Sequence, residues 1–107
     1  MENRQLIIDL NNFRSSKSAV FAGRERGYEV RKKITDERLN SANKIRFVIP
    51  DDVYAINSSF LLGLLGDTIR IHQKNKEDVS NIIEIPEDFK RTFEDAIREA
   101  GQVKNLL

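Results

Sequence analysis

A mostly apolar segment followed by a serine-containing helix start constrains this chain more than any other feature. Residues 45–50 read Ile-Arg-Phe-Val-Ile-Pro, which is typical of a buried strand that ends at a proline. After a polar loop, Asn57-Ser58-Ser59 leads into a long apolar run. Asn and Ser favour helix amino ends because their short side-chain oxygens accept backbone N–H groups of the first turn. The segment predicts a strand, a loop and a helix that extends to about His72, with Asn57 as its cap.

The rest of the chain repeats this alternation. A β-branched run at 5–10 and the run 82–85 predict two further strands, whereas spacings of three and four residues predict helices over 23–39 and from Pro86 onward. The polar stretches 11–22 and 73–81 are expected to be loops. The order β, α, β, α, β, α predicts an α/β layer fold, with a central sheet of about three to four strands and helices packed against it.

Length and composition exclude several classes of protein. At 107 residues the chain fits one compact domain, so residues 1–107 are expected to form a single unit. Without cysteine there is no disulfide, thiolate nucleophile or Cys-based zinc site, and His72 is the only histidine. No run approaches the length of a membrane helix, and the amino end lacks a secretory cleavage site. We therefore expect a cytoplasmic protein that is not an enzyme and that holds neither metal nor cofactor.

The charges are distributed unevenly along the chain. Residues 1–50 carry 11 Lys and Arg against 6 Asp and Glu, whereas residues 51–107 carry 7 against 11, so the net charges are +5 and −4. This predicts a dipolar surface that orients a partner. Phosphate-ligand or nucleic-acid binding by the basic first helix is one alternative function, although interleaved acids dilute its field and nucleic acid is not the expected partner. The residues concerned are Arg24, Arg26, Arg31, Lys32 and Lys33.

The helix that follows Ser59 is more apolar than a surface helix requires. Five of the six residues from Phe60 to Leu65 are apolar, so something must cover the excess. Neighbouring elements are one candidate; the other is a partner or a second copy of the chain, with Phe60 and Leu62 as contact residues. Gly63 and Gly66 lower helix propensity, which indicates that a backbone approaches closely there.

Two hypotheses account for Ser58 and Ser59. Either hydroxyl can serve as a plain helix cap, which typically contributes about 1 kcal/mol. Either is also a phosphoacceptor candidate, because the positive end of the helix dipole accommodates the added charge. Phosphorylation would then alter a binding surface without melting the helix.

Two segments resemble STAS domains, the fold of bacterial anti-sigma-factor antagonists, and more closely the uncharacterised STAS-like family. The first, Gly-Arg-Glu-Arg-Gly-Tyr-Glu-Val-Arg at 23–31, looks like that family's opening to its first helix. The second is Ile-Asn-Ser-Ser-Phe-Leu-Leu-Gly-Leu-Leu-Gly at 56–66. Together they anchor the resemblance over roughly residues 20–72, and the remainder fits in element order.

The resemblance implies a function. In well-characterised antagonists the corresponding turn reads Asp-Ser-Ser-Gly or Asp-Ser-Thr-Gly, and a histidine-kinase-like ATPase phosphorylates its second hydroxyl. By that match Ser59 is the phosphoacceptor candidate, with Asn57 in place of the Asp and Phe60 in place of the Gly. We expect a regulatory protein–protein interaction module that exchanges partners on phosphorylation, with Arg24 and Arg26 as a second contact group. A structural homo-oligomer built on the apolar helix is the other alternative.

Overall fold

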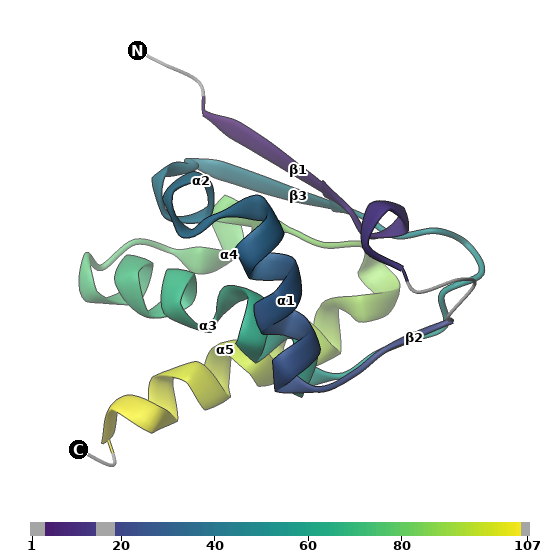
Figure 1. The fold of residues 1–107 in the computed structure, drawn as a ribbon. Helices are drawn as coiled ribbons and strands as arrows, with labels where there is room; N and C mark the ends of the chain where they lie inside the picture. The colour runs from purple at the N-terminus through teal and green to yellow at the C-terminus, as the bar shows by residue number, and fades with distance from the viewer. Residues whose placement is uncertain (1–3, 15–18, 106–107) are drawn as a thin grey trace.

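Three parallel strands form the main sheet, and the helices pack against one of its faces (Figure 1). The computed structural model describes residues 4–14 and 19–105. In chain order the elements are β1 Gln5–Asp9, the 3-10 helix η1 Leu10–Phe13, β2 Val20–Phe21, α1 Arg24–Ile34, α2 Asp36–Ser41, β3 Lys44–Val48, β4 Ala55–Ile56, α3 Ser58–Lys74, α4 Val79–Ile82, β5 Ile83–Glu84, the 3-10 helix η2 Glu87–Phe89 and α5 Lys90–Asn105. This confirms the predicted α/β layer fold.

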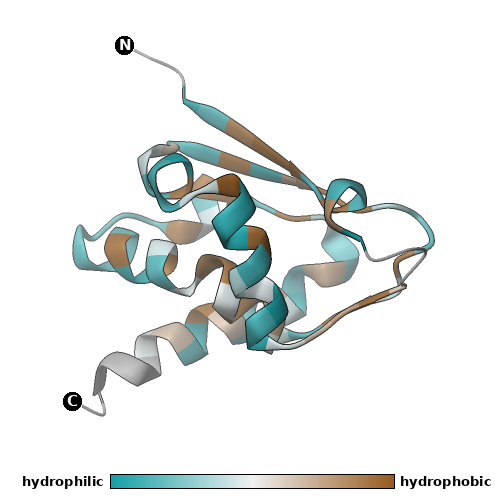
Figure 2. Ribbon diagram, in the orientation of Figure 1, coloured by the Kyte–Doolittle hydropathy of each residue, from teal (hydrophilic) through white to brown (hydrophobic). Residues whose placement is uncertain are grey.

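The main sheet has the strand order β1-β3-β5 and one buried face. Ile7 lies beside Arg46, which in turn lies beside Glu84, and all three are on the outer face. The alternate residues face the helices, because successive side chains of a strand point to opposite faces. Brown and teal segments accordingly alternate along β3 (Figure 2). The buried strand residues are Leu6, Ile8, Ile45, Phe47 and Ile83.

A second, two-stranded parallel ribbon connects this sheet to the helices. Val20 pairs with Ala55 and Phe21 with Ile56. The chain thus takes the same path twice, from β1 through β2 to α1 and from β3 through β4 to α3 (Figure 1). The sequence did not predict these strands, because two residues are too few to show the period-2 alternation.

Helix α3 occupies the centre of the helical layer. It packs against both α1 and α5, and Phe60, Leu64 and Ile69 are fully buried. A helix that is apolar on nearly all sides is expected where neighbours cover every side. The predicted stripe on α5 is confirmed: Phe93 and Ala100 are buried, and half-buried Phe89 and Ile97 pack against the same core.

Residues 23–39 do not form the single helix that the sequence predicted. Thr35 has φ 93° and ψ 144°, a conformation that no α-helix contains. Its N–H donates to Arg31 O and closes α1, while its Oγ1 accepts the Arg38 N–H and opens α2. One threonine therefore ends one helix and caps the next.

Two predicted loops also contain short helices. Within 11–22, the 3-10 helix η1 is capped by Asp9, whose Oδ1 accepts the Asn11 N–H, and residues 15–18 lie outside the described residues. Within 73–81, α3 extends to Lys74 and α4 begins at Val79. Pro86, which was predicted to lie in the first turn of the last helix, instead precedes the 3-10 turn η2 that leads into α5.

Candidate functional site

The amino ends of α1 and α3 meet where the β2–β4 ribbon ends. The Asn57 N–H donates to Phe21 O over 2.9 Å, which ties the start of α3 to the end of β2. Gly23 and Asn57 are the N-cap residues of α1 and α3, respectively. Two positive helix ends thus lie side by side.

Glycines allow the two helices to pack almost backbone to backbone. A Cβ atom on Gly27 would lie 2.2 Å from Phe60 O, and one on Gly63 would lie 2.1 Å from Arg24 O. The close approach predicted at Gly63 is therefore confirmed. At Gly66 it is wrong, because a Cβ atom there would meet only the flexible Arg70 side chain, at 3.4 Å and beyond.

Ser59 lies at the outer end of this glycine contact. Its Oγ accepts the Gly23 N–H over 3.3 Å, and the side chain is half-buried. Ser58, the first residue of α3, is also half-buried. The Ser59 hydroxyl thus joins the amino ends of both helices.

Asn57 occupies the N-cap position but does not cap through its side chain. The N–H groups of Phe60 and Leu61 both donate to the backbone carbonyl of Asn57, over 3.1 and 3.3 Å. A capping side chain normally takes one of the N–H groups of the first turn, and the Phe60 N–H already has a partner. The Asn57 side chain is exposed.

Phe60 and Leu62 are core residues, so the expectation that they contact a partner is wrong. Phe60 is 0% exposed and its ring packs on Phe21, with centroids 5.2 Å apart and planes inclined by 56°. Leu62 is 7% exposed. Neighbouring elements cover the apolar excess of α3, so α3 does not present the apolar surface that the alternative of a homo-oligomer required.

The two arginines of the second contact group have different surroundings. Arg24 is exposed at the start of α1. Arg26 is half-buried; its Nη2 donates to Phe13 O over 2.5 Å, and its Nη1 lies 3.8 Å from Glu29. Arg24 is thus exposed at the start of α1, whereas Arg26 holds η1 against α1.

Arg31 is buried, although the sequence placed it with the residues of the first helix that are solvated or available to a phosphate. Its Nη1 donates to Leu64 O over 2.7 Å and to Thr68 Oγ1 over 3.0 Å, and its Nη2 donates to Asn40 Oδ1 over 3.1 Å. Its Nε pairs with Asp36. This polar network joins α1, α2 and α3, and charged groups are buried only when they are paired in this way.

The ribbon exposes two apolar side chains that the sequence pattern did not indicate. Tyr54 is 76% exposed and precedes β4, and Val20 in β2 is 37% exposed. The only signal in the sequence was the polar loop before Tyr54. We define the amino-end surface as six exposed or half-buried residues at the two helix starts and along the ribbon that leads to them: Val20, Arg24, Tyr54, Asn57, Ser58 and Ser59.

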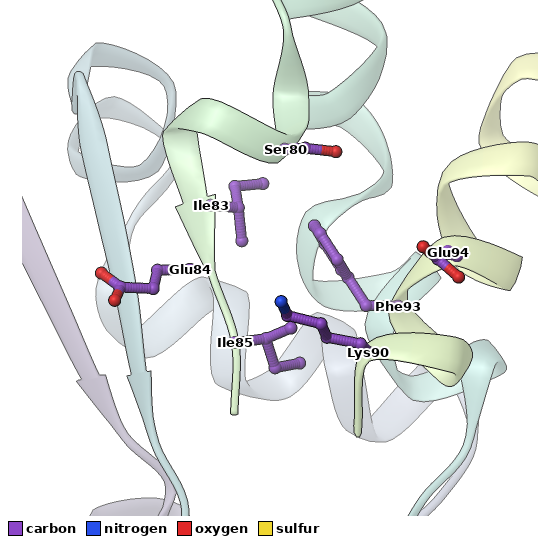
Figure 3. Close-up of a pocket in the computed structure, with 7 residues that line it drawn as sticks. All are labelled: Ser80, Ile83, Glu84, Ile85, Lys90, Phe93 and Glu94. Atoms are coloured by element: carbon purple, nitrogen blue, oxygen red, sulfur yellow. The ribbon is translucent and has the colours of Figure 1, made fainter. Parts of the chain in front are cut away.

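Two cavities border β5 and the residues that follow it. One of about 240 Å³ separates β5 from α5, and Figure 3 shows Phe93 and Lys90 in this gap while Glu84 points to the other side of β5. A wider one of about 410 Å³ lies beyond the carboxyl ends of β3 and β5, with Tyr54 on its rim. Among the described residues, no cluster of His, Asp and Glu is suited to hold a metal ion. None of the helices in that part of the chain has the length and apolarity to cross a membrane.

His72 lies buried in the last turns of α3, at 6% exposure. Its Nδ1 is 2.9 Å from Glu77 Oε1, and its Nε2 has no hydrogen-bond partner among the described residues. No nucleophilic side chain pairs with it in that part of the structure. It packs the carboxyl end of α3 against the loop that precedes α4.

No family model, curated protein or solved structure matches the chain. The likeness to STAS-like proteins rests on the segments 23–31 and 56–66. In the structure these segments begin α1 and α3 and pack against each other through Gly27 and Gly63. Membership of that family stays a prediction.

Proposed function

We propose that this chain is a non-enzymatic regulatory binding module of the STAS-like kind. Its partner binds the amino-end surface, and phosphorylation of Ser59 releases that partner. One observation carries the proposal: the half-buried Ser59 hydroxyl accepts the Gly23 N–H and so lies between the amino ends of two helices. A charge added there acts on both helix starts at once.

The electrostatics of this position favour a phosphoryl group. A phosphoserine carries about −1.5 to −2 charges at neutral pH, and negative charge is stabilised near helix amino ends. The Gly23 N–H supplies a donor, and the first turn of α1 carries an exposed cation, Arg24, and an exposed acid, Glu25. Phosphorylation should therefore leave the fold intact.

Packing determines where the phosphoryl group goes. Directly inside Ser59, α1 and α3 touch through Gly27 and Gly63, which leaves no room for even a methyl group. The phosphoryl oxygens would then lie outside this helix contact, at the amino ends of the two helices. A partner that contacts Tyr54 and Ser58 would meet a new negative charge, whose desolvation opposes binding. Ser58 is the second phosphoacceptor candidate on the same surface.

The alternative functions have less support. Phosphate binding by the basic first helix depends on arginines that the fold uses, because Arg31 is buried in a network and Arg26 donates to Phe13. Homo-oligomerisation through α3 depends on Phe60 and Leu62, which are buried. By contrast, the residues of the amino-end surface, such as Ser58, Ser59 and Tyr54, are half-buried or exposed in the structure.

A capture experiment tests the proposal. Wild type, Ser59→Ala, Ser59→Asp and the control Ser80→Asp are used as baits in lysate of the organism that encodes the chain, and captured proteins are identified by mass spectrometry. Ser80 is an exposed serine on α4, away from the amino-end surface. We expect an ATPase-type regulator on wild type, Ser59→Ala and Ser80→Asp, with at least tenfold less on Ser59→Asp. Circular dichroism verifies that each bait is folded. Equal capture by all four baits would contradict the proposal.

A salt titration separates this function from phosphate binding. Complexes that depend on phosphate contacts weaken steeply as the salt concentration rises, whereas contacts by Tyr54 and Val20 respond weakly. A steep loss of the captured partner between low and moderate salt would favour the basic-helix alternative.

A further inference from the structure

The two edges of the main sheet differ in how they are protected. β5 pairs through two residues only and is followed closely by Pro86. Short edge strands and prolines are two of the ways in which proteins prevent pairing with another chain. β1 is five residues long, is regularly paired with β3, and contains no proline, glycine or lysine. Among the described residues nothing pairs with its outer edge.

β1 also exposes an apolar side chain where a protected edge would carry a charge. Ile7 is 56% exposed in the middle of the strand, on the outer face of the sheet. Leu6 and Ile8 on either side face the core. A regular edge strand with an exposed isoleucine at its centre is a template for pairing with another strand.

The sequence of β1 is complementary to itself in the antiparallel direction. Pairing two copies about Ile7 places Ile7 opposite Ile7, Leu6 opposite Ile8, and Gln5 opposite Asp9. Every apolar residue then faces an apolar residue of the second copy, and Asp9 of each copy faces Gln5 and not the other Asp9. Each buried residue also stays on the buried face, since paired residues in a sheet share a face.

Other antiparallel registers lack this complementarity. A different register keeps every side chain on its own face of the sheet only if the two-fold axis moves to another residue of β1, such as Leu6 or Ile8. Centring the pair on Leu6 places Gln5 opposite Ile7, and centring it on Ile8 places Asp9 opposite Ile7. Both registers set a polar group against the isoleucine. The centre at Ile7 is therefore preferred.

We propose that the outer edge of β1 is a docking site for a second copy of this chain. The two β1 strands pair antiparallel about a two-fold axis at Ile7 and extend the main sheet across both copies. The surface is separate from the amino-end surface, which lies at the starts of α1 and α3. A dimer thus presents two partner surfaces at once.

Cysteine cross-linking tests the two-fold axis directly. The chain has no cysteine, so Ile7→Cys introduces a single thiol at an exposed site. Directly opposed residues of antiparallel strands have Cα atoms about 4.5–5.5 Å apart, which suits a disulfide. The control is Val48→Cys on β3, 39% exposed on the same outer face. In the proposed dimer the two β3 strands are three strand spacings apart, about 14 Å, which is too far for a disulfide.

The expected result is a disulfide-linked dimer of Ile7→Cys under mild oxidation and no comparable dimer of Val48→Cys. Equal cross-linking of both variants would indicate random collision and overturn the proposal. Absence of cross-linking in Ile7→Cys, together with a monomer in sedimentation at millimolar concentration, would overturn it as well. The edge would then be free for a different chain or for a terminal segment of this one.

Charge changes at Gln5 test the register without altering buried residues. Gln5→Lys places a cation opposite Asp9 of the second copy twice per dimer, and Gln5→Glu places an acid there twice. Cross-strand charge pairs change the dimer dissociation constant by roughly 2- to 30-fold for two pairs. Lys44 lies beside Gln5 within the same copy and acts equally on monomer and dimer. Gln5→Lys should dimerise more tightly than wild type and Gln5→Glu more weakly in analytical ultracentrifugation, and the opposite order would overturn the register.

Discussion

Replacing Gly63 by alanine tests the α1–α3 contact that positions Ser59. The new Cβ would lie 2.1 Å from Arg24 O and 3.1 Å from Tyr28 N, and both are backbone atoms that cannot rotate away. Restoring ordinary contact requires the helices to separate by roughly 1 Å. Overpacking of this kind costs about 3 kcal/mol, at the upper end of its usual range, while alanine gains about 1 kcal/mol of helix propensity. The free energy of unfolding should fall by about 2 kcal/mol.

Gly66→Ala is the matched control, three residues along the same helix. Its Cβ would meet only the Arg70 side chain, at 3.4 Å or more, so the gain in helix propensity is retained. We expect about 1 kcal/mol of added stability. Urea unfolding followed by circular dichroism measures both changes, with an unchanged slope against denaturant. The reasoning is refuted if Gly63→Ala is as stable as wild type, or if the two substitutions act in the same direction.

Two further predictions concern Arg31 and Tyr54. Arg31→Ala removes the buried guanidinium that joins α1 to Leu64 O of α3 and to Asn40 of α2, so it should lower the free energy of unfolding by about 3 kcal/mol. The exposed Lys32→Ala should change it by less than about 0.5 kcal/mol in the same urea titration. Tyr54→Ala should weaken capture of the partner at least fivefold without changing the melting temperature. The control Tyr28→Ala, which alters the chain's other tyrosine, should leave capture unchanged. An equal loss of captured partner in both variants would contradict the placement of the surface.

Elements with a strong local signal were predictable from the sequence. β1 and β3 appear where short apolar runs indicated strands, α3 appears after its Asn-Ser-Ser start, and α5 appears where three- and four-residue spacing indicated a helix. The low helix propensity of Gly63 and Gly66 predicted a close backbone at both positions, which is confirmed at Gly63 and wrong at Gly66. These signals are local, so no knowledge of the tertiary contacts was needed.

The remaining features depend on tertiary contacts that no local pattern encodes. The break at Thr35 has no glycine or proline to indicate it. Arg31 looked like part of a solvated basic face, and its burial is favourable because the fold brings polar partners from α2 and α3 to its guanidinium. Phe60 was predicted as a partner contact because the sequence does not show how much of α3 its neighbours cover. In the structure α1 and α5 pack on α3, and Phe60 is buried. Of the predicted contact residues, Ser58, Ser59 and Arg24 come together, while Arg26 is engaged by η1.

The central claim is that a phosphoryl group on Ser59 controls binding at the amino-end surface. The most direct test is to prepare the chain with phosphoserine incorporated at position 59 or, as a control, at position 80, and to measure the affinity of each for the captured regulator by isothermal titration calorimetry. The account predicts at least tenfold weaker binding with phosphoserine at 59 and unchanged binding with phosphoserine at 80. Equal affinities for the two phosphorylated proteins and the unmodified chain would contradict it.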